Sequence, residues 1–160
     1  MDVSTIDGLY RAHGHSVLRR ARRLLGNEEE AREVLHDVFV SLLARPTQFR
    51  GASALTTWLY GATTHGCLNL LRNQRTRARL LAEGGAAEAP SCTAQGAERL
   101  AILRDLLARL PPELARVAVY YYADEMTHDE IASVLECSRR HIGDLLKRLR
   151  ERIRDLEDVS

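Results

Sequence analysis

Hydrophobic residues recur every three or four positions through most of this 160-residue chain. This spacing places them along one face of an α-helix. The first such stretch ends at Gly26, a residue type that often follows the last turn of a helix. Asn27 and the three glutamates after it are typical of a new start, because the side-chain oxygen caps free N–H groups and carboxylates favour the positive end of the helix dipole. The pattern predicts two successive helices, the second continuing to Pro46.

A third helix is predicted after the short loop 46–53 (PTQFRGAS), with Ser53 as its N-cap. It carries hydrophobic residues on one face and ends in a run of arginines: Arg72, Arg75, Arg77 and Arg79. Residues 82–96 (AEGGAAEAPSCTAQG) then bury little surface, which favours a flexible linker.

Helix resumes near Ala97 and runs to a Pro-Pro pair at 111–112, which breaks it before a further helix over 113–122. The segment 127–156 predicts two more helices. Thr127 and Glu130 have the spacing of a capping box, and Ser138 follows a tight turn as the second N-cap. Two short helices joined in this way describe a helix-turn-helix, whose second helix enters the major groove of DNA.

Basic side chains follow the start of that second helix. Arg139, Arg140 and His141 lie where base edges or phosphates would be met, and Lys147, Arg148 and Arg150 lie where phosphates would position the protein. A plain amphipathic hairpin with a solvated arginine face remains the alternative at this point.

Composition and charge narrow the class of protein. The 5% of aromatic residues favours helix over sheet, and residues 1–81 hold 12 arginines against 7 acidic residues, which weakly indicates a polyanionic partner. No apolar run is long enough to span a membrane, so no membrane insertion is expected. Three cysteines without metal-type spacing indicate the reducing cytoplasm.

The expected fold is therefore all-α: an N-terminal helical bundle over 1–81, the linker 82–96, and a compact helix-turn-helix domain over 97–160. Paired carboxylates, a nucleophile with its base, a phosphate-cradling glycine loop and a metal cluster are all lacking in the sequence. We therefore expect no enzyme, no cofactor and no metal.

Three stretches, taken in order, resemble the extracytoplasmic-function (ECF) sigma factors of bacterial RNA polymerase. The stretch ARRLLGNEEEAREVLHDVFVSLL resembles the start of that family's region two. The stretch FRGASALTTWLYGATTHGCLNLLRNQR is similar to its F-R-G-x-S-x-x-T-W-L segment and the following helix. LPPELARVAVYYYADEMTHDEIASVL resembles the opening of its region four. Together they cover nearly the whole chain except the linker, and the ordered set is more specific than any one motif.

The resemblance implies a sigma factor that binds core polymerase, recognises promoter DNA, melts the minus-ten element and is held by an anti-sigma factor. Contacts to the polymerase β′ clamp helices are implied for Glu33, His36 and Asp37. The β flap is the second implied docking point. Contacts to the minus-ten element are implied for Phe49, Arg50, Gly51, Ala52 and Ser53, which would hold a flipped base, and for His65, Asn69 and Arg72. Contacts to the minus-thirty-five element are implied for Arg139, Arg140, His141, Asp144, Lys147 and Arg148.

The chain departs from the family pattern at two places. Gly61, Thr64 and His65 stand where basic or amide residues are usual. In the second helix of the helix-turn-helix, Gly143 weakens the helix by up to about 1 kcal/mol relative to alanine, and Asp144 faces a polyanion unfavourably. These departures keep a second hypothesis open: a sigma-like binding module that occupies an anti-sigma factor or polymerase without initiating transcription.

Overall fold

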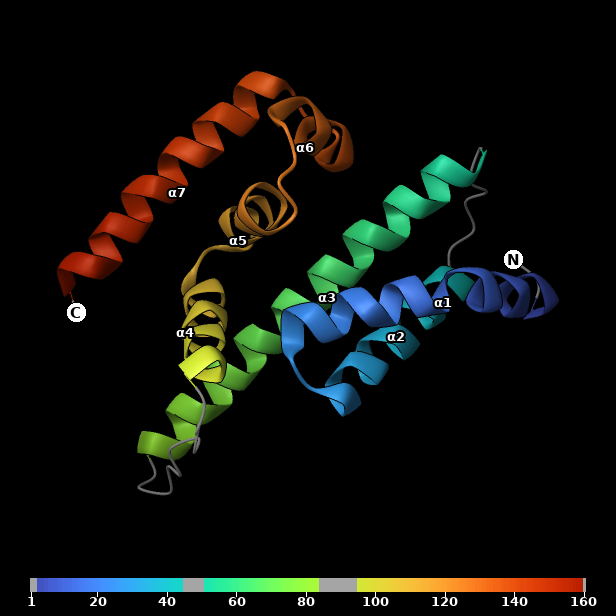
Figure 1. Cartoon of the computed structure of the whole chain (residues 1–160), viewed down its shortest axis with the longest axis horizontal. Helices are drawn as coiled ribbons and strands as arrows, with labels where there is room; N and C mark the ends of the chain where they lie inside the picture. The colour runs from blue at the N-terminus through green and yellow to red at the C-terminus, as the bar shows by residue number, and fades with distance from the viewer. Residues whose placement is uncertain (1–2, 45–50, 84–94, 160) are drawn as a thin grey trace. The chain divides into compact units, whose positions relative to one another are not determined.

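The computed structural model describes residues 3–44, 51–83 and 95–159, and every regular element in these ranges is helical (Figure 1). The all-α fold class is thereby confirmed. The chain divides into two compact units, Met1–Cys67 and Leu68–Ser160, with the division inside the long third helix. None of the helices in the described ranges is both long and apolar enough to span a membrane.

The first unit contains α1 (Val3–Leu25), α2 (Glu28–Leu43) and the first half of α3 (Gly51–Glu83). The turn between α1 and α2 forms as the sequence predicts. Gly26 adopts a positive φ of 69°, and its N–H donates to the carbonyl of Arg22 at 2.7 Å. Asn27 then caps α2, its Oδ1 accepting from the N–H of Glu30 at 3.0 Å. Only two residues separate the helices, so α1 and α2 pack against each other along their length.

The core of this unit is built from one apolar face of each helix. Its buried side chains are Val17, Ala21 and Leu25 on α1, Ala31, Val34, Leu35, Val38, Phe39 and Leu42 on α2, and Leu55, Leu59 and Cys67 on α3. In the first half of α1, the ring of Tyr10 contacts Phe39 edge-on with 5.1 Å between centroids. Gly66 allows a close approach, because a Cβ placed there would lie 3.3 Å from Cγ1 of Val34.

The predicted N-cap of the third helix is wrong. Helix α3 begins at Gly51, so Ser53 lies within its first turn instead of before it. Serine is common both as an N-cap and in a first turn, and the local sequence does not distinguish the two. At its other end, α3 continues to Glu83, and the next helix begins at Gln95. The domain boundaries at 81 and 97 and the flexibility of the linker stay predictions.

The second unit contains the rest of α3 and the elements α4 (Gln95–Arg109), α5 (Pro112–Ala118), η1 (Val119–Ala123), α6 (His128–Leu135) and α7 (Arg139–Val159). Pro112 is the first residue of α5, a position where a missing N–H breaks no hydrogen bond. The single helix predicted over 113–122 divides into α5 and a π-helical turn, η1.

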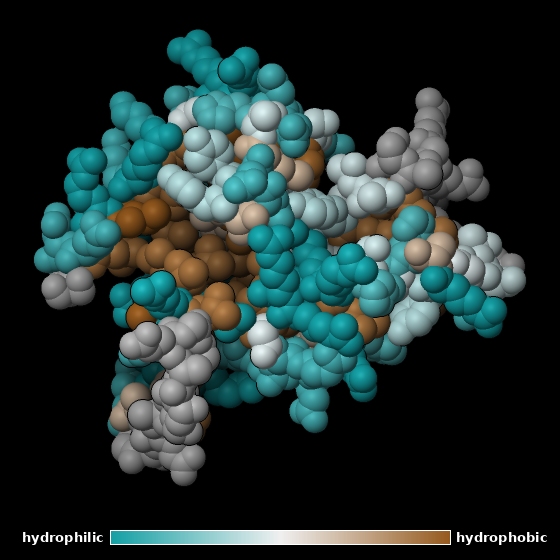
Figure 2. Space-filling model, in the orientation of Figure 1, coloured by the Kyte–Doolittle hydropathy of each residue, from teal (hydrophilic) through white to brown (hydrophobic). Residues whose placement is uncertain are grey.

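Helix α7 packs on α5 and α6 through the apolar face that the sequence predicts. Its fully buried residues are Ile142, Leu145, Leu146 and Leu149. They meet Leu114, Val117 and Tyr120 of the α5–η1 segment and Ile131 and Ala132 of α6 in one core. In this unit Figure 2 shows apolar side chains gathered in a hollow between α4 and α7. Helix α4 leaves Leu100, Ile102 and Leu103 exposed.

Candidate protein and nucleic-acid interfaces

The outer face of α2 carries the predicted protein contacts. Helix α2 buries Val34, Leu35 and Val38, so the residues between them point to solvent. Glu33, His36 and Asp37 are all exposed, and their i, i+3, i+4 spacing puts them on one face. The structure therefore brings the predicted trio together as an acidic surface on a helix that two neighbours hold in place.

An ion pair fixes the corner at which α2 begins. Arg22 near the end of α1 donates through Nε and Nη2 to the carboxylate of Glu28, the Nη2 bond being 2.7 Å long. Arg32 adds a third bond to Glu28 at 3.2 Å. The hydrogen bond from Arg22 lowers the pKa of Glu28 below its ordinary value, and the same bond raises the pKa of Arg22.

Of the predicted base-holding loop, Phe49 and Arg50 lie outside the described residues. Gly51, Ala52 and Ser53 form the first turn of α3, not a loop. Three more of the predicted minus-ten residues lie further along α3. His65 and Asn69 are exposed and Arg72 is half-buried, and their i, i+4, i+7 spacing aligns them on one side of the helix. Arg72 Nη2 also donates to the carbonyl of Leu110 at 3.1 Å.

Thr64 does not face solvent with this row of residues. It is 0% exposed, and its hydroxyl accepts from Nε and Nη2 of Arg20 at 3.0 and 2.8 Å. The guanidinium of Arg20 also lies 3.8 Å from the ring centroid of Tyr60. Arg20 therefore brings a cation from α1 to the side of α3 at Thr64. Sequence reasoning missed Arg20 because an arginine at a partly buried helix position looks the same as a surface arginine.

The helix-turn-helix forms with the predicted caps. Thr127 Oγ1 accepts from the N–H of Glu130 at 3.1 Å, and Ser138 Oγ accepts from the N–H of His141 at the same distance. Between the helices Glu136 adopts a left-handed conformation with φ of 54°. The N–H of Cys137 then donates to the carbonyl of Ala132 at 3.0 Å, which closes the turn.

The predicted DNA-contacting residues lie on the outer side of α7. Arg139, Arg140, His141, Asp144, Lys147 and Arg148 are all exposed, whereas the buried face of α7 lies on the other side. Arg139 lies 3.7 Å from Asp129 on α6, but both side chains are at least 69% exposed, so this pair is weak. The structure thus leaves five basic or imidazole side chains and one carboxylate outside the buried core of this unit.

An aromatic cluster lies next to the helix-turn-helix, and no sequence pattern predicts its geometry. The N–H of Asp124 donates to the carbonyl of Val119 at 3.0 Å, the bond that defines the π-helical turn η1. Within this turn Tyr120 is fully buried and Tyr122 is 56% exposed, as expected from three consecutive tyrosines that cannot all face inward. The ring of Tyr121 lies 4.9 Å from that of Tyr122 and 5.8 Å from that of His128.

Metal and thiol chemistry finds little support in the described ranges. No group of three or more potential ligands is present among those residues. His65 is exposed whereas Cys67 is buried, so the two do not share a side of α3. Burial raises the pKa of the Cys67 thiol to about 12, against a smaller opposing effect of the Arg20 charge, so the thiol stays protonated near neutral pH.

Comparisons with known proteins agree on one family. Models of sigma-70 region 2 and of sigma-70 region 4 match residues 9–77 and 100–153. The chain is 26% identical to the RNA polymerase sigma factor YlaC of Bacillus subtilis, covering 91% of this chain and 88% of that protein. It is also 26% identical to the ECF RNA polymerase sigma factor SigE of Mycolicibacterium smegmatis, covering 93% of this chain but 60% of SigE.

A third relative and a solved structure complete the comparison. Identity to the RNA polymerase sigma-H factor of Pseudomonas aeruginosa is 25%, over 95% of this chain and 86% of that protein. The fold is similar to that of the sigma factor RpoE of Bartonella quintana, solved in complex with the anti-sigma factor NepR. The TM-score is 0.52 at 20% identity, with 99% of each chain covered.

Proposed function

Because the chain belongs to the ECF sigma factors of bacterial RNA polymerase, we propose that it initiates transcription through three surfaces, on α2, α3 and α7. The observation that carries this proposal is the helix-turn-helix, whose α7 presents its cationic face opposite a fully buried apolar face. Such a protein is an initiation factor that acts with cytoplasmic polymerase, and it is not itself an enzyme.

The outer face of α7 is the proposed contact to the minus-thirty-five element. Arg139, Arg140 and His141 follow the Ser138 cap, so they stand at the end of the helix that enters the groove first. Lys147 and Arg148 lie two turns further on, where phosphates would fix the register of the helix on the duplex. Asp144 lies between the two groups and opposes binding.

The acidic face of α2 is the proposed contact to the β′ clamp helices, with the β flap as a second docking point for the C-terminal domain. Glu33, His36 and Asp37 are exposed on a helix whose other side is packed in the core. A rigid, preformed surface binds without an ordering cost, which supports its use as a docking site.

The proposed minus-ten surface starts at 49–53 and continues along α3 to His65, Asn69 and Arg72. Arg20 adds a positive charge beside this helix through its bonds to Thr64. Arg72 would exchange its hydrogen bond to the Leu110 carbonyl for a DNA phosphate. We further propose an anti-sigma partner for this chain, since the similar RpoE was solved with one.

The polymerase contact is tested with a charge reversal on α2. We expect Glu33→Lys combined with Asp37→Lys to abolish binding to core polymerase and run-off transcription from the promoter upstream of the gene, because the acidic face would repel its former partner. The matched control is Glu83→Lys with Glu98→Lys, two exposed positions outside the proposed surfaces. Equal loss in both double variants, or no effect in either, contradicts the assignment of α2.

A second candidate function is a sigma-like module that binds polymerase or an anti-sigma factor without initiating. It is motivated by Gly143 and Asp144 in the proposed DNA-reading helix. Permanganate footprinting of the promoter with core polymerase separates the two. Thymines of the minus-ten element react only if the DNA is melted, so reactive thymines exclude the non-initiating module. Binding to core polymerase without reactive thymines supports that module and contradicts the initiating function.

A further inference from the structure

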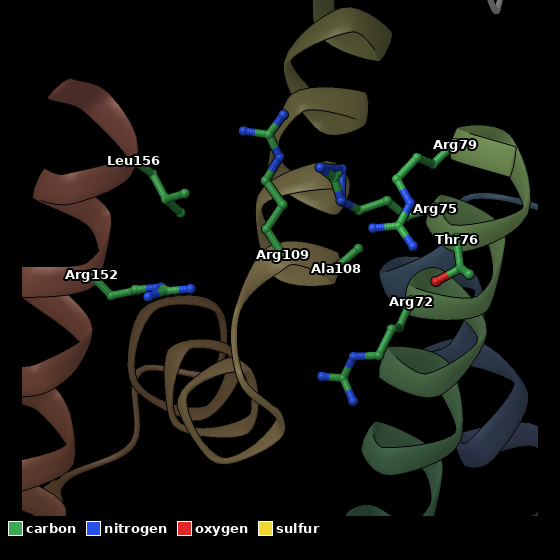
Figure 3. Close-up of a pocket in the computed structure, with 8 residues that line it drawn as sticks. All are labelled: Arg72, Arg75, Thr76, Arg79, Ala108, Arg109, Arg152 and Leu156. Carbon is green, nitrogen blue, oxygen red and sulfur yellow. The ribbon is translucent and has the colours of Figure 1, made fainter. Parts of the chain in front are cut away.

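A pocket rich in arginine lies in the second unit (Figure 3). Its volume is about 490 Å³. The lining residues are Arg72, Arg75, Thr76 and Arg79 from α3, Ala108 and Arg109 from α4, and Arg152 and Leu156 from α7. We call this set the arginine pocket. All of its residues belong to the unit Leu68–Ser160.

The spacing of its α3 residues explains why one helix supplies half of the pocket. Arg72, Arg75, Thr76 and Arg79 stand at i, i+3, i+4 and i+7, so their side chains leave the same side of the helix. In Figure 3 the Arg152 side chain extends from α7 toward α4, and the Arg109 side chain lies in the space between α4 and α7. Cations from three helices therefore line one open hollow.

Positive charge in the arginine pocket exceeds the negative charge beside it. Five of its eight lining residues are arginines and none is acidic. Asp105 bridges two of them, lying 3.1 Å from Arg75 Nη1 and 3.1 Å from Arg109 Nε. A single carboxylate cannot neutralise both guanidinium groups, and the bond from Arg72 goes to the neutral carbonyl of Leu110. A bound polyanion would relieve the remaining repulsion.

The donors in the pocket suit phosphate oxygens. Guanidinium groups stay charged at all physiological pH values and bind phosphate through paired N–H groups. Thr76 adds a hydroxyl to the lining. The volume lies within the range of small-molecule sites, about 300–1,000 Å³, and would take several adjacent phosphates. Carboxylates along a peptide carry one charge each at wider spacing, so they match five clustered cations less well.

We propose that the arginine pocket binds a run of adjacent phosphates. Two sources share this chemistry: a free oligophosphate and the backbone of a single-stranded nucleic acid. The site is independent of promoter recognition by α7, because its residues other than Arg72 belong to none of the surfaces proposed above. Binding is therefore testable on the full chain without polymerase or promoter.

The test is calorimetric titration of the full-length protein with inorganic tripolyphosphate. We expect saturable binding at one site, weakened at least about tenfold in the double variant Arg79→Gln/Arg152→Gln, which removes two charge-assisted contacts. The matched control is Arg77→Gln/Arg154→Gln, which takes the same charge from exposed positions of the same two helices outside the lining. It should bind within about twofold of the parent, since distant surface charges are screened.

A second titration, with a short single-stranded oligonucleotide, distinguishes the sources. If its affinity falls in the Arg79/Arg152 variant but not in the control, the natural ligand is a nucleic-acid strand; if only tripolyphosphate binding falls, it is a free oligophosphate. Should the double variant unfold, the single variant Arg79→Gln takes its place. Equal weakening in variant and control, no binding of either probe, or tighter pocket-dependent binding of an oligoglutamate peptide overturns the proposal.

Discussion

Two arginines of α1 bond to polar groups on the other helices of the first unit. Arg22 is bonded to Glu28 across the α1–α2 turn, and Arg20 is bonded to Thr64 of α3. The two bonds differ in burial. Arg22 and Glu28 are both more than 40% exposed, so water and salt screen their attraction, whereas Thr64 is fully buried. The free energy of unfolding should therefore depend on the second bond more than on the first.

The exposed ion pair of Arg22 and Glu28 predicts a small effect on stability that depends on pH. The folded-state pKa of Glu28 is below its ordinary value of 4.5, so the ionised form stabilises the folded state. This contribution is complete above the unfolded-state pKa and disappears as the pH falls through the folded one. We expect Glu28→Gln to lower the urea midpoint at pH 7 but not at pH 2. The control is Glu29→Gln in the same first turn, which measures the contribution of the helix dipole. An equal loss at both pH values in Glu28→Gln would contradict the prediction.

The buried hydroxyl of Thr64 predicts a larger loss of stability when it is removed. Thr64→Val keeps the shape of the side chain but removes the acceptor for Arg20 and the donor to the Tyr60 carbonyl. We expect the free energy of unfolding to fall by about 1–3 kcal/mol, because polar partners lose their bonds in a buried place. Urea titration measures it, with the exposed Thr57→Val of the same helix as control. Indistinguishable variants would show that Arg20 has no structural role.

At the scale of elements, N-caps stabilise the helices at their starts, and glycines inside the helices lower their stability. Thr127 caps the start of α6 and Ser138 caps the start of α7, and Glu136 forms the turn between them. Gly143 lies inside α7 without a packing reason, because a Cβ there would meet nothing within 4 Å. By contrast, a Cβ on Gly66 would press on Val34. An added Cβ therefore has open space in α7 and a close neighbour in α3.

The surroundings of the three glycines predict different responses of stability to alanine. We expect Gly143→Ala to raise the free energy of unfolding by about 0.5–1 kcal/mol, because alanine loses less backbone entropy in a helix. Gly8→Ala, equally open in α1, should gain a similar amount. Gly66→Ala should gain less or lose stability. Thermal and urea unfolding of the three variants checks this order, and loss of stability in Gly143→Ala would indicate a constraint that its open surroundings do not explain.

The N-cap of α6 predicts a loss of stability when its side-chain oxygen is removed. Thr127→Ala removes the acceptor for the N–H of Glu130 and should lower the free energy of unfolding by about 1 kcal/mol. Thr127→Ser keeps the oxygen and should retain most of the stability. The exposed Ser133→Ala, inside the same helix, is the control, and its expected change is within about 0.5 kcal/mol. Equal unfolding curves for Thr127→Ala and Ser133→Ala would rule out the cap as a source of stability.

At the scale of the whole molecule, the formal net charge is only +1, because acidic and basic surfaces nearly cancel in the sum. The outer face of α2 is acidic, the outer face of α7 is mainly basic, and the arginine pocket concentrates five cations. Each surface can therefore meet a partner of opposite charge without a large net charge on the protein.

The surface of α7 predicts how DNA affinity depends on charge and salt. Asp144→Asn removes a carboxylate beside the proposed phosphate contacts and should raise affinity for a promoter fragment by about two- to fivefold. Arg148→Gln should lower affinity and reduce the salt slope by about one. Fluorescence anisotropy at low and high salt measures both, with Asp155→Asn as the exposed control late in α7. Unchanged affinity and slope in both variants would exclude this face from DNA binding.

The sequence by itself determined the helices, their caps at Asn27, Thr127 and Ser138, the buried face of α7, and the family. The helices, the caps and the buried face depend on residues within about four positions of one another, so a local pattern contains the information they need. The family follows from the order of three stretches along the chain. The start of α3 was misplaced by three residues because serine suits both an N-cap and a first turn.

Only the tertiary structure decided which polar groups meet across the chain. Thr64 is buried under an arginine that lies 44 residues earlier, and the arginine pocket joins side chains of α3, α4 and α7. Spacing along one helix places residues on a face, but packing between helices determines what that face meets. The predicted faces of α2 and α7 could be found from sequence because each depends on one helix, whereas Arg20 and the arginine pocket could not.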